Sequence, residues 1–226
     1  TTFGSVQTTV DFARDQRLQL AGILVAFDGP PRIPSPPGTA NLVIAAPTIN
    51  DLDNSLGYTM ATMPINEDVQ TRNAGAVTLT VPLNDLPPTP GGCTPNWNTL
   101  MTLVTQARDA DGNQAGWLYY GLLPNGVPMG PVIGCGGGVA TGTLGDQVTM
   151  AHEIGHLLGR PHAPCGNVGT PDATYPAYEP YDSAAALMAR IGEYGLDIRD
   201  GTLHPPGEND FMSYCGPRWV SLHNHN

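Results

Sequence analysis

One short segment constrains this chain of 226 residues more than any other feature. His152 and His156 are four positions apart in a stretch, over 145–158, whose apolar residues recur at helical spacing. Residues four apart lie one above the other on a helix, so both imidazoles can share one metal ion. Gly159 can adopt a positive φ and end that helix, which lets His162 approach the same ion from outside. The segment therefore predicts a helix, a sharp turn and three histidine ligands.

Glu153 directly follows the first of these histidines, beside the face that would hold the metal. From that position its carboxylate can reach a water bound to the ion. Three neutral imidazoles and one water make a four-coordinate catalytic zinc site, whereas structural zinc sites usually have four protein ligands. The residue types therefore favour a single catalytic Zn²⁺ ion as the cofactor.

The pattern H-E-x-x-H-x-x-G-x-x-H, over 152–162, resembles the signature of the metzincin clan of zinc endopeptidases. That clan has a methionine turn beneath the metal, and the segment Asp210–Tyr214 is similar to it, with Met212 as the methionine. Tyr214 matches a tyrosine that astacins and serralysins place near zinc as a retractable fifth ligand; the alternative is that it is a bystander. The same segment is similar to one in secreted bacterial metallopeptidases. The subfamily stays open.

The resemblance implies a secreted, zinc-dependent endopeptidase in which Glu153 acts as general base on a zinc-activated water. It also implies a protein or peptide substrate bound in extended form along a sheet edge. The candidate edge is Gly136–Thr143, for which a flexible loop is the alternative. A noncatalytic extracellular binding module that retains the zinc site is the alternative function, but the intact Glu153 favours the enzyme.

Four cysteines, an even number, suit two disulfides in an oxidising compartment and allow three pairings. Cys165 lies just past the third histidine and Cys215 just past the methionine turn, two places that the zinc site would bring together. We therefore expect a Cys165–Cys215 bond, which leaves Cys93 to pair with Cys135.

Charge excludes several classes of partner. The basic residues number 9, all of them arginine, against 20 acids, and the formal net charge is −11. Nucleic acids and anionic membranes need clustered positive charge, so neither is expected as a partner. No stretch approaches the ~20 apolar residues of a membrane helix. A monomer secreted from the cell, of bacterial origin by the resemblance above, is the expectation.

Strand-like and helix-like patterns alternate before residue 160, which favours an α+β fold. By the resemblance it would be a metzincin-like catalytic domain: a mixed twisted sheet, an active-site helix and a loop-rich C-terminal subdomain. The Pro-rich stretch over 30–38 either separates an N-terminal part, 1–38, from the catalytic part, 39–226, or is a surface loop of one domain. Strands are expected over 6–12, 18–27, 42–46 (buried), 76–81, 117–123 and within 134–143, and helices over 55–63, 96–107 and 145–158.

Calcium is only weakly supported. Asp109–Asn113 is similar to part of a calcium loop, but a helix-ending turn is the better interpretation. Asp51 and Asp53 are better explained as a helix cap. Three histidines outside the motif are expected at the surface or in a frayed tail, although the first could line the cleft: His204, His223 and His225.

Overall fold

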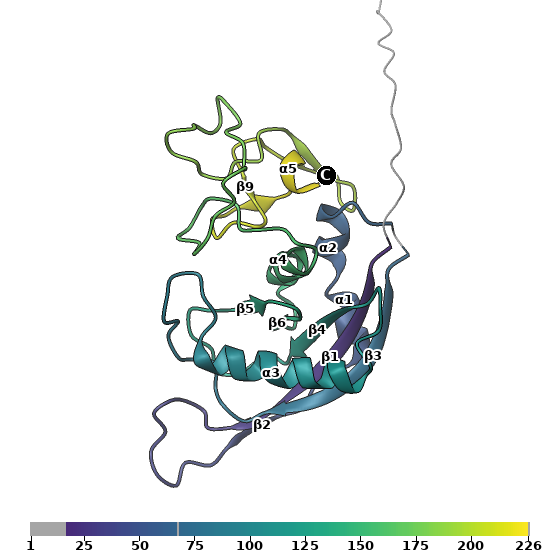
Figure 1. Cartoon of the computed structure of the whole chain (residues 1–226), viewed down its shortest axis with the longest axis vertical. Coiled ribbons are helices and arrows are strands. Elements are labelled where there is room, and N and C mark those ends of the chain that lie inside the picture. Colours follow the sequence, from purple (N-terminus) through teal and green to yellow (C-terminus); the bar gives the residue numbers. More distant parts are fainter. Residues whose placement is uncertain (1–16, 67, 226) are drawn as a thin grey trace, which may run out of the picture.

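A mixed sheet of six strands forms the centre of the computed structural model, which describes residues 17–66 and 68–225 (Figure 1). The central strand β1 has β3 along one side, while β4 and then β2 pair along the other. β6 lies between β4 and β5, and β5 is the antiparallel edge. The strands are β1 (Gln19–Gly29), β2 (Leu42–Ile44), β3 (Gln70–Leu79), β4 (Leu118–Leu123), β5 (Gly134–Gly136) and β6 (Ala140–Thr143).

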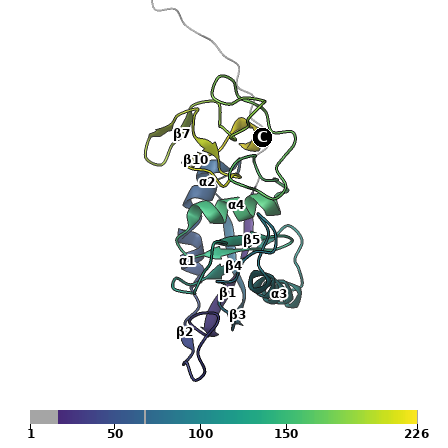
Figure 2. The ribbon, with the colours of Figure 1, turned by 90° about the vertical axis from the view of Figure 1, so that its left-hand side faces the viewer.

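Helices cover this sheet, and α4 lies between it and the C-terminal part of the chain (Figure 2). That part contains two small two-stranded sheets and a short terminal helix, and otherwise consists of loops. The α+β class, the mixed sheet and the loop-rich C-terminal part are therefore confirmed. The remaining elements are α1 (Ile49–Asn54), α2 (Gly57–Thr62), α3 (Pro95–Ala110), α4 (Gln147–Leu157), β7 (Gly195–Asp197), β8 (Thr202–His204), β9 (Asn209–Asp210), β10 (Arg218–Trp219) and α5 (Leu222–His225).

The side chains of β1 alternate between two cores because successive strand residues point to opposite faces. Ile23 and Phe27 belong to the core that α3 completes with Trp97. Leu20 belongs to the other core, to which α4 contributes Ile154. A strand buried on both faces requires a nearly continuous apolar run, which explains the sequence over 18–27.

Most predicted elements are present, with shifted ends. The strands over 18–27, 76–81 and 117–123 and the helices over 96–107 and 145–158 are confirmed. The strand over 42–46 was expected to be buried, but β2 is a short outer strand whose Val43 is 71% exposed. The helix expected over 55–63 is present as α2, and a second short helix that was not expected, α1, precedes it. The strand expected over 6–12 lies outside the described residues.

Two local interpretations also have structural outcomes. The Pro-rich stretch over 30–38 is the loop that joins β1 to β2. Asp51 belongs to a capping box at the start of α1: its carboxylate accepts from the Thr48 backbone N–H at 2.7 Å, and the Thr48 hydroxyl accepts from the Asp51 backbone N–H at 3.2 Å. In the described part of the chain, no helix has the length and apolar content needed to cross a bilayer.

The segment with a possible calcium function ends α3 instead. Gly112, with φ +85°, reverses the chain, and the backbone N–H groups of residues 112 and 113 donate to carbonyls of the last helical turn. The Asp111 carboxylate accepts hydrogen bonds from the Arg72 guanidinium and, at 2.6 Å, from the Tyr119 hydroxyl. These bonds tie the end of α3 to β3 and β4.

These hydrogen bonds to Asp111 predict how the stability of the fold depends on pH in the acidic range. The bonds from Arg72 and Tyr119 lower the pKa of the Asp111 carboxyl to about 2. Because the folded pKa is depressed from its ordinary value near ~3.9, the stabilisation is present above that value and is lost as the pH falls toward ~2. We expect Asp111→Asn to lower the thermal midpoint at pH 6, and the difference from wild type to shrink between about pH 4 and pH 2.

Thermal unfolding followed by circular dichroism across this pH range checks the prediction. Asp109→Asn is the matched control, since the Asp109 side chain is 57% exposed and bonds only its neighbour Arg108 among the described residues. A loss of stability in Asp111→Asn that is the same at pH 2 and pH 6 would contradict the stabilising role assigned to the ionised Asp111 carboxylate.

Candidate metal centre

Helix α4 carries the first two histidines and has a defined start and end. The Asp146 carboxylate caps its start, accepting from the Thr149 backbone N–H at 3.0 Å. At its end, Gly159 has φ +82°, and the Arg160 backbone N–H donates to the Gly155 carbonyl at 2.9 Å. This is the Schellman pattern, so the predicted glycine turn is confirmed.

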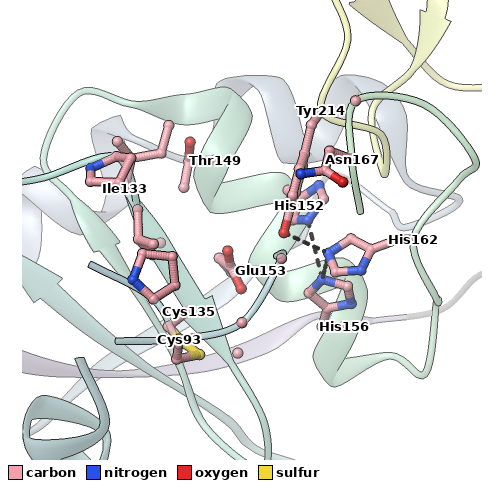
Figure 3. Close-up of a pocket in the computed structure, with 18 of the residues that line it drawn as sticks. Cys93, Ile133, Cys135, Thr149, His152, Glu153, His156, His162, Asn167 and Tyr214 are labelled. Atoms are coloured by element: carbon pink, nitrogen blue, oxygen red, sulfur yellow. Dashed lines mark hydrogen bonds between the residues drawn. A yellow bond between two sulfur atoms is a disulfide. The ribbon is translucent and has the colours of Figure 1, made fainter. Parts of the chain in front are cut away.

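The three histidines of the motif converge on one point (Figure 3). The Nε2 atom of His156 lies 3.1 Å from the Nε2 atoms of both His152 and His162. Nitrogens bound tetrahedrally to one ion at 2.0–2.1 Å would be roughly 3.3 Å apart. The three side chains could therefore hold a metal ion through their Nε2 atoms.

Backbone carbonyls fix the tautomer of the two helix histidines. Nδ1 of His152 donates to the carbonyl of Phe211 at 2.9 Å, and Nδ1 of His156 donates to the carbonyl of Arg160 at 2.8 Å. Nε2 of both residues then carries a lone pair, so the 3.1 Å contact between these two atoms is repulsive unless a cation lies beside them. Carbonyl partners of this kind orient metal-binding histidines in general.

Burial also keeps these rings neutral, as metal ligands must be. Burial lowers the pKa of His152 to about 3 and that of His162 to about 4. It lowers the pKa of His156 as well. All three imidazoles are therefore uncharged at neutral pH, each with one N–H.

Glu153 places an unpaired carboxylate next to the histidine cluster. The residue is only 6% exposed, and its Oε2 atom has no hydrogen-bond partner among the described residues. Burial raises its pKa to about 8. A Cβ atom at Gly134 or at Gly136 would lie 2.7 Å from one of its carboxylate oxygens. The glycines of β5 therefore leave the space that this side chain occupies.

The methionine segment packs closely against α4 at Gly155. Met212 is fully buried, and a Cβ atom on Gly155 would lie 2.5 Å from its Sδ atom. The buried Asp210 carboxylate holds the turn, accepting from the backbone N–H of Met212 at 2.7 Å and from the Asn224 amide at 2.8 Å. This turn presents the Phe211 carbonyl that orients His152.

Hydrogen bonds and a disulfide join the chain after His162 to the methionine turn. Two backbone hydrogen bonds, of 3.1 and 3.0 Å, connect these stretches, and the Cys165–Cys215 disulfide closes the same junction. The hydroxyl of Tyr214 thereby lies 3.1 Å from Nε2 of His162. The predicted pairing is confirmed, and Tyr214 lies beside the histidine cluster.

A cavity of about 440 Å³ opens in front of the histidines and Glu153. Its other walls are β5 with the preceding residues 131–133, the loop over 87–93, and a C-terminal wall formed by Gly166, Asn167, Tyr214 and Arg218. The Cys93–Cys135 disulfide, the pairing expected for the other two cysteines, joins two of these walls.

The expected sheet edge over 136–143 is only partly correct. β6 is paired on both sides, with β4 and with β5, so its residues are interior to the sheet. The outer strand beside the cavity is β5, Gly134–Gly136, and only Gly136 of the expected segment belongs to it. The pairing partner of each strand, which sequence patterning does not reveal, decides which one is at the edge.

Two histidines outside the motif, His223 and His204, make specific contacts within the structure. Nε2 of His223 lies 2.8 Å from the Asp172 carboxylate, and the Asp172 backbone N–H donates to the carbonyl of His162 at 2.7 Å. His223 therefore supports the third ligand instead of fraying. His204 stacks on Trp219 with ring centroids 3.9 Å apart and does not line the cavity. Neither has a sequence signal, because the partners are distant in sequence.

Over 17–66 and 68–225, the only group of three or more His, Cys, Asp or Glu side chains close enough to hold an ion is this histidine cluster. The acidic residues considered for calcium form no such group there. No protein-family model matches the chain, and no curated protein or solved structure matches it either.

The geometry predicts one metal ion per chain. Titration with Zn²⁺ as the probe should saturate at one equivalent, and at about 100 times the Kd it should add about 2.7 kcal/mol to stability. His162→Ala should weaken binding by more than the ~10–100-fold typical of a lost supporting partner. Calorimetric titration and thermal unfolding measure both effects.

His225→Ala is the matched control, because His225 is exposed and lies outside the cluster. Equal zinc affinity in His162→Ala and His225→Ala would show that the cluster does not hold the ion.

Proposed function

We propose that this protein is a zinc-dependent endopeptidase that acts outside the cell. The observation that carries the proposal is the unpaired carboxylate of Glu153, buried beside three convergent imidazole nitrogens. Burying a carboxylate without a partner costs stability, and a chemical task accounts for that cost. A protein that used the metal only to bind or to fold would not need it.

His152, His156 and His162 would hold the zinc ion, which would supply Lewis acidity toward water and toward a peptide carbonyl. Glu153 lies where it can accept a proton from attacking water and return it to the leaving amine. Its pKa, raised to about 8 by burial, is near the range in which a group can do both. Tyr214 can donate a hydrogen bond to the developing oxyanion.

The free side of β5 supports a peptide as the substrate. Gly134–Gly136 is the outer strand of the sheet and lines the cavity. Unpaired backbone groups of an edge strand can bind an extended peptide as an additional strand. Such binding would lay the peptide backbone across the front of Glu153.

The disulfides support an oxidising location. All four cysteines are paired, in Cys93–Cys135 and Cys165–Cys215. Disulfides of this kind persist in secreted proteins and are rare in the cytosol. Cys93–Cys135 lines the cavity, and Cys165–Cys215 holds residues next to the lining residues Gly166 and Tyr214. Reducing conditions would therefore loosen the walls of the proposed active site.

The test of the function is the loss of peptide hydrolysis in Glu153→Gln. This variant should still bind one equivalent of zinc, but its turnover of casein should fall by about 10²–10⁴-fold, the range for loss of a general base. A chelator should abolish wild-type hydrolysis, and added Zn²⁺ should restore it.

Glu193→Gln makes the same change at an exposed position outside the cavity and should leave hydrolysis unchanged. Wild-type rates in zinc-loaded Glu153→Gln would rule out the assigned base.

The hydroxyl of Tyr214 should act on the rate more than on binding. Tyr214→Phe removes the donor but retains the ring, so kcat should fall by roughly 10²-fold while KM changes little. Steady-state kinetics on a fluorogenic peptide separates the two constants. Tyr181→Phe is the matched control, since Tyr181 is 47% exposed and outside the cavity. An unchanged kcat would make Tyr214 a bystander.

A further inference from the structure

Arg218 is a basic side chain in the cavity wall that has no ion-pair partner among the described residues. Within 17–66 and 68–225 it is the one arginine that lines the cavity, and the chain contains no lysine. Four of the other seven described arginines form ion pairs with aspartates: Arg72 with Asp111, Arg108 with Asp109, Arg17 with Asp68 and Arg199 with Asp197. Among 20 acidic residues, none of those described forms an ion pair with Arg218.

The Nε atom of Arg218 is held by a hydrogen bond, while its two terminal nitrogens are available to a ligand. Arg218 lies on β10, which pairs with β9, and its Nε donates to the carbonyl of Cys215 at 2.8 Å. Cys215 is itself held by the disulfide to Cys165. The two terminal nitrogens, Nη1 and Nη2, make no hydrogen bond to any residue within 17–66 and 68–225. A fixed guanidinium with two free donors fits the two oxygens of a carboxylate.

Arg218 lines the same cavity as Tyr214, Glu153 and the histidine cluster. Residues of the facing cavity wall are apolar and would accept a neutral side chain: Pro131, Val132 and Ile133. The cavity therefore offers a cationic wall on the C-terminal side and an apolar wall beside β5.

We propose that Arg218 makes this cavity selective for peptides that present a carboxylate next to the bond to be cleaved. The inference rests on the peptidase function proposed above. The carboxylate could be an Asp or Glu side chain within the peptide, or the free carboxylate at a peptide's C-terminus. Both would form the same paired hydrogen bonds with the guanidinium, so the experiment includes an arm for each.

Binding is measured first, without cleavage, on zinc-loaded Glu153→Gln. Fluorescence anisotropy compares peptides that differ only by Glu or Gln at one position, which is moved along the peptide; the C-termini are amidated in one series and free in another. We expect the Glu peptide to bind about tenfold more tightly at one position, as a charge-assisted pair in a partly shielded cavity would allow. Adding Arg218→Gln should remove the difference, whereas adding Arg218→Lys should keep part of it.

Arg32→Gln, added to the same background, is the matched control because Arg32 is exposed in the loop between β1 and β2. It makes the same change in net charge and should keep the preference. Equal Glu-to-Gln ratios with and without Arg218→Gln would overturn the inference. A preference that appears only with a free C-terminus would support the carboxylate site and assign it to the chain end.

The same peptides then test cleavage by the wild type. Hydrolysis that depends on Glu153 but proceeds at the same rate for the Glu and Gln peptides would contradict the role of Arg218. The proposed peptidase function would still be supported in that case. If zinc-loaded wild type cleaves no peptide of either series, the proposed function fails, and the inference fails with it.

Discussion

The close approach of the methionine turn to α4 is the contact on which the rest of the site depends. At Gly155, between the two helix histidines, there is no side chain, and the sulfur of Met212 occupies that space. The same turn supplies the carbonyl that orients His152 and, through two backbone bonds and a disulfide, brings the chain after His162 to the helix. A larger residue at 155 would therefore displace the supports of the metal ligands together.

A second space left by glycines explains the position of Glu153. The strand β5 has no side chains at Gly134 and Gly136, so the carboxylate packs against its backbone and stays without a partner. Because the same strand is the outer edge of the sheet, the proposed base and the proposed peptide-binding edge are adjacent. The lack of side chains at Gly134 and Gly136 therefore allows Glu153 to pack against β5 and leaves this strand accessible to a peptide.

The sequence predicts local features well and non-local ones poorly. The i,i+4 histidines and the turn at Gly159 follow from helix geometry, and they are present as expected. The Cys165–Cys215 pairing is also correct, because it depends on the convergence of the same ligands, and it leaves Cys93 to pair with Cys135. The role of His223, the exposed side of β2 and the identity of the edge strand depend on partners that lie far away in sequence. Arg218 was missed for the same reason, since nothing in its sequence neighbours indicates that it lines the cavity.

The central claim is that three imidazoles, positioned by α4 and the methionine turn, hold one zinc ion beside an unpaired carboxylate. Anomalous diffraction from a crystal of the zinc-loaded protein, collected on both sides of the zinc absorption edge, tests this most directly. The account predicts one strong anomalous peak at about 2.0–2.1 Å from Nε2 of His152, His156 and His162. A crystal in which zinc binds elsewhere, while these three nitrogens contact no ion, would contradict it.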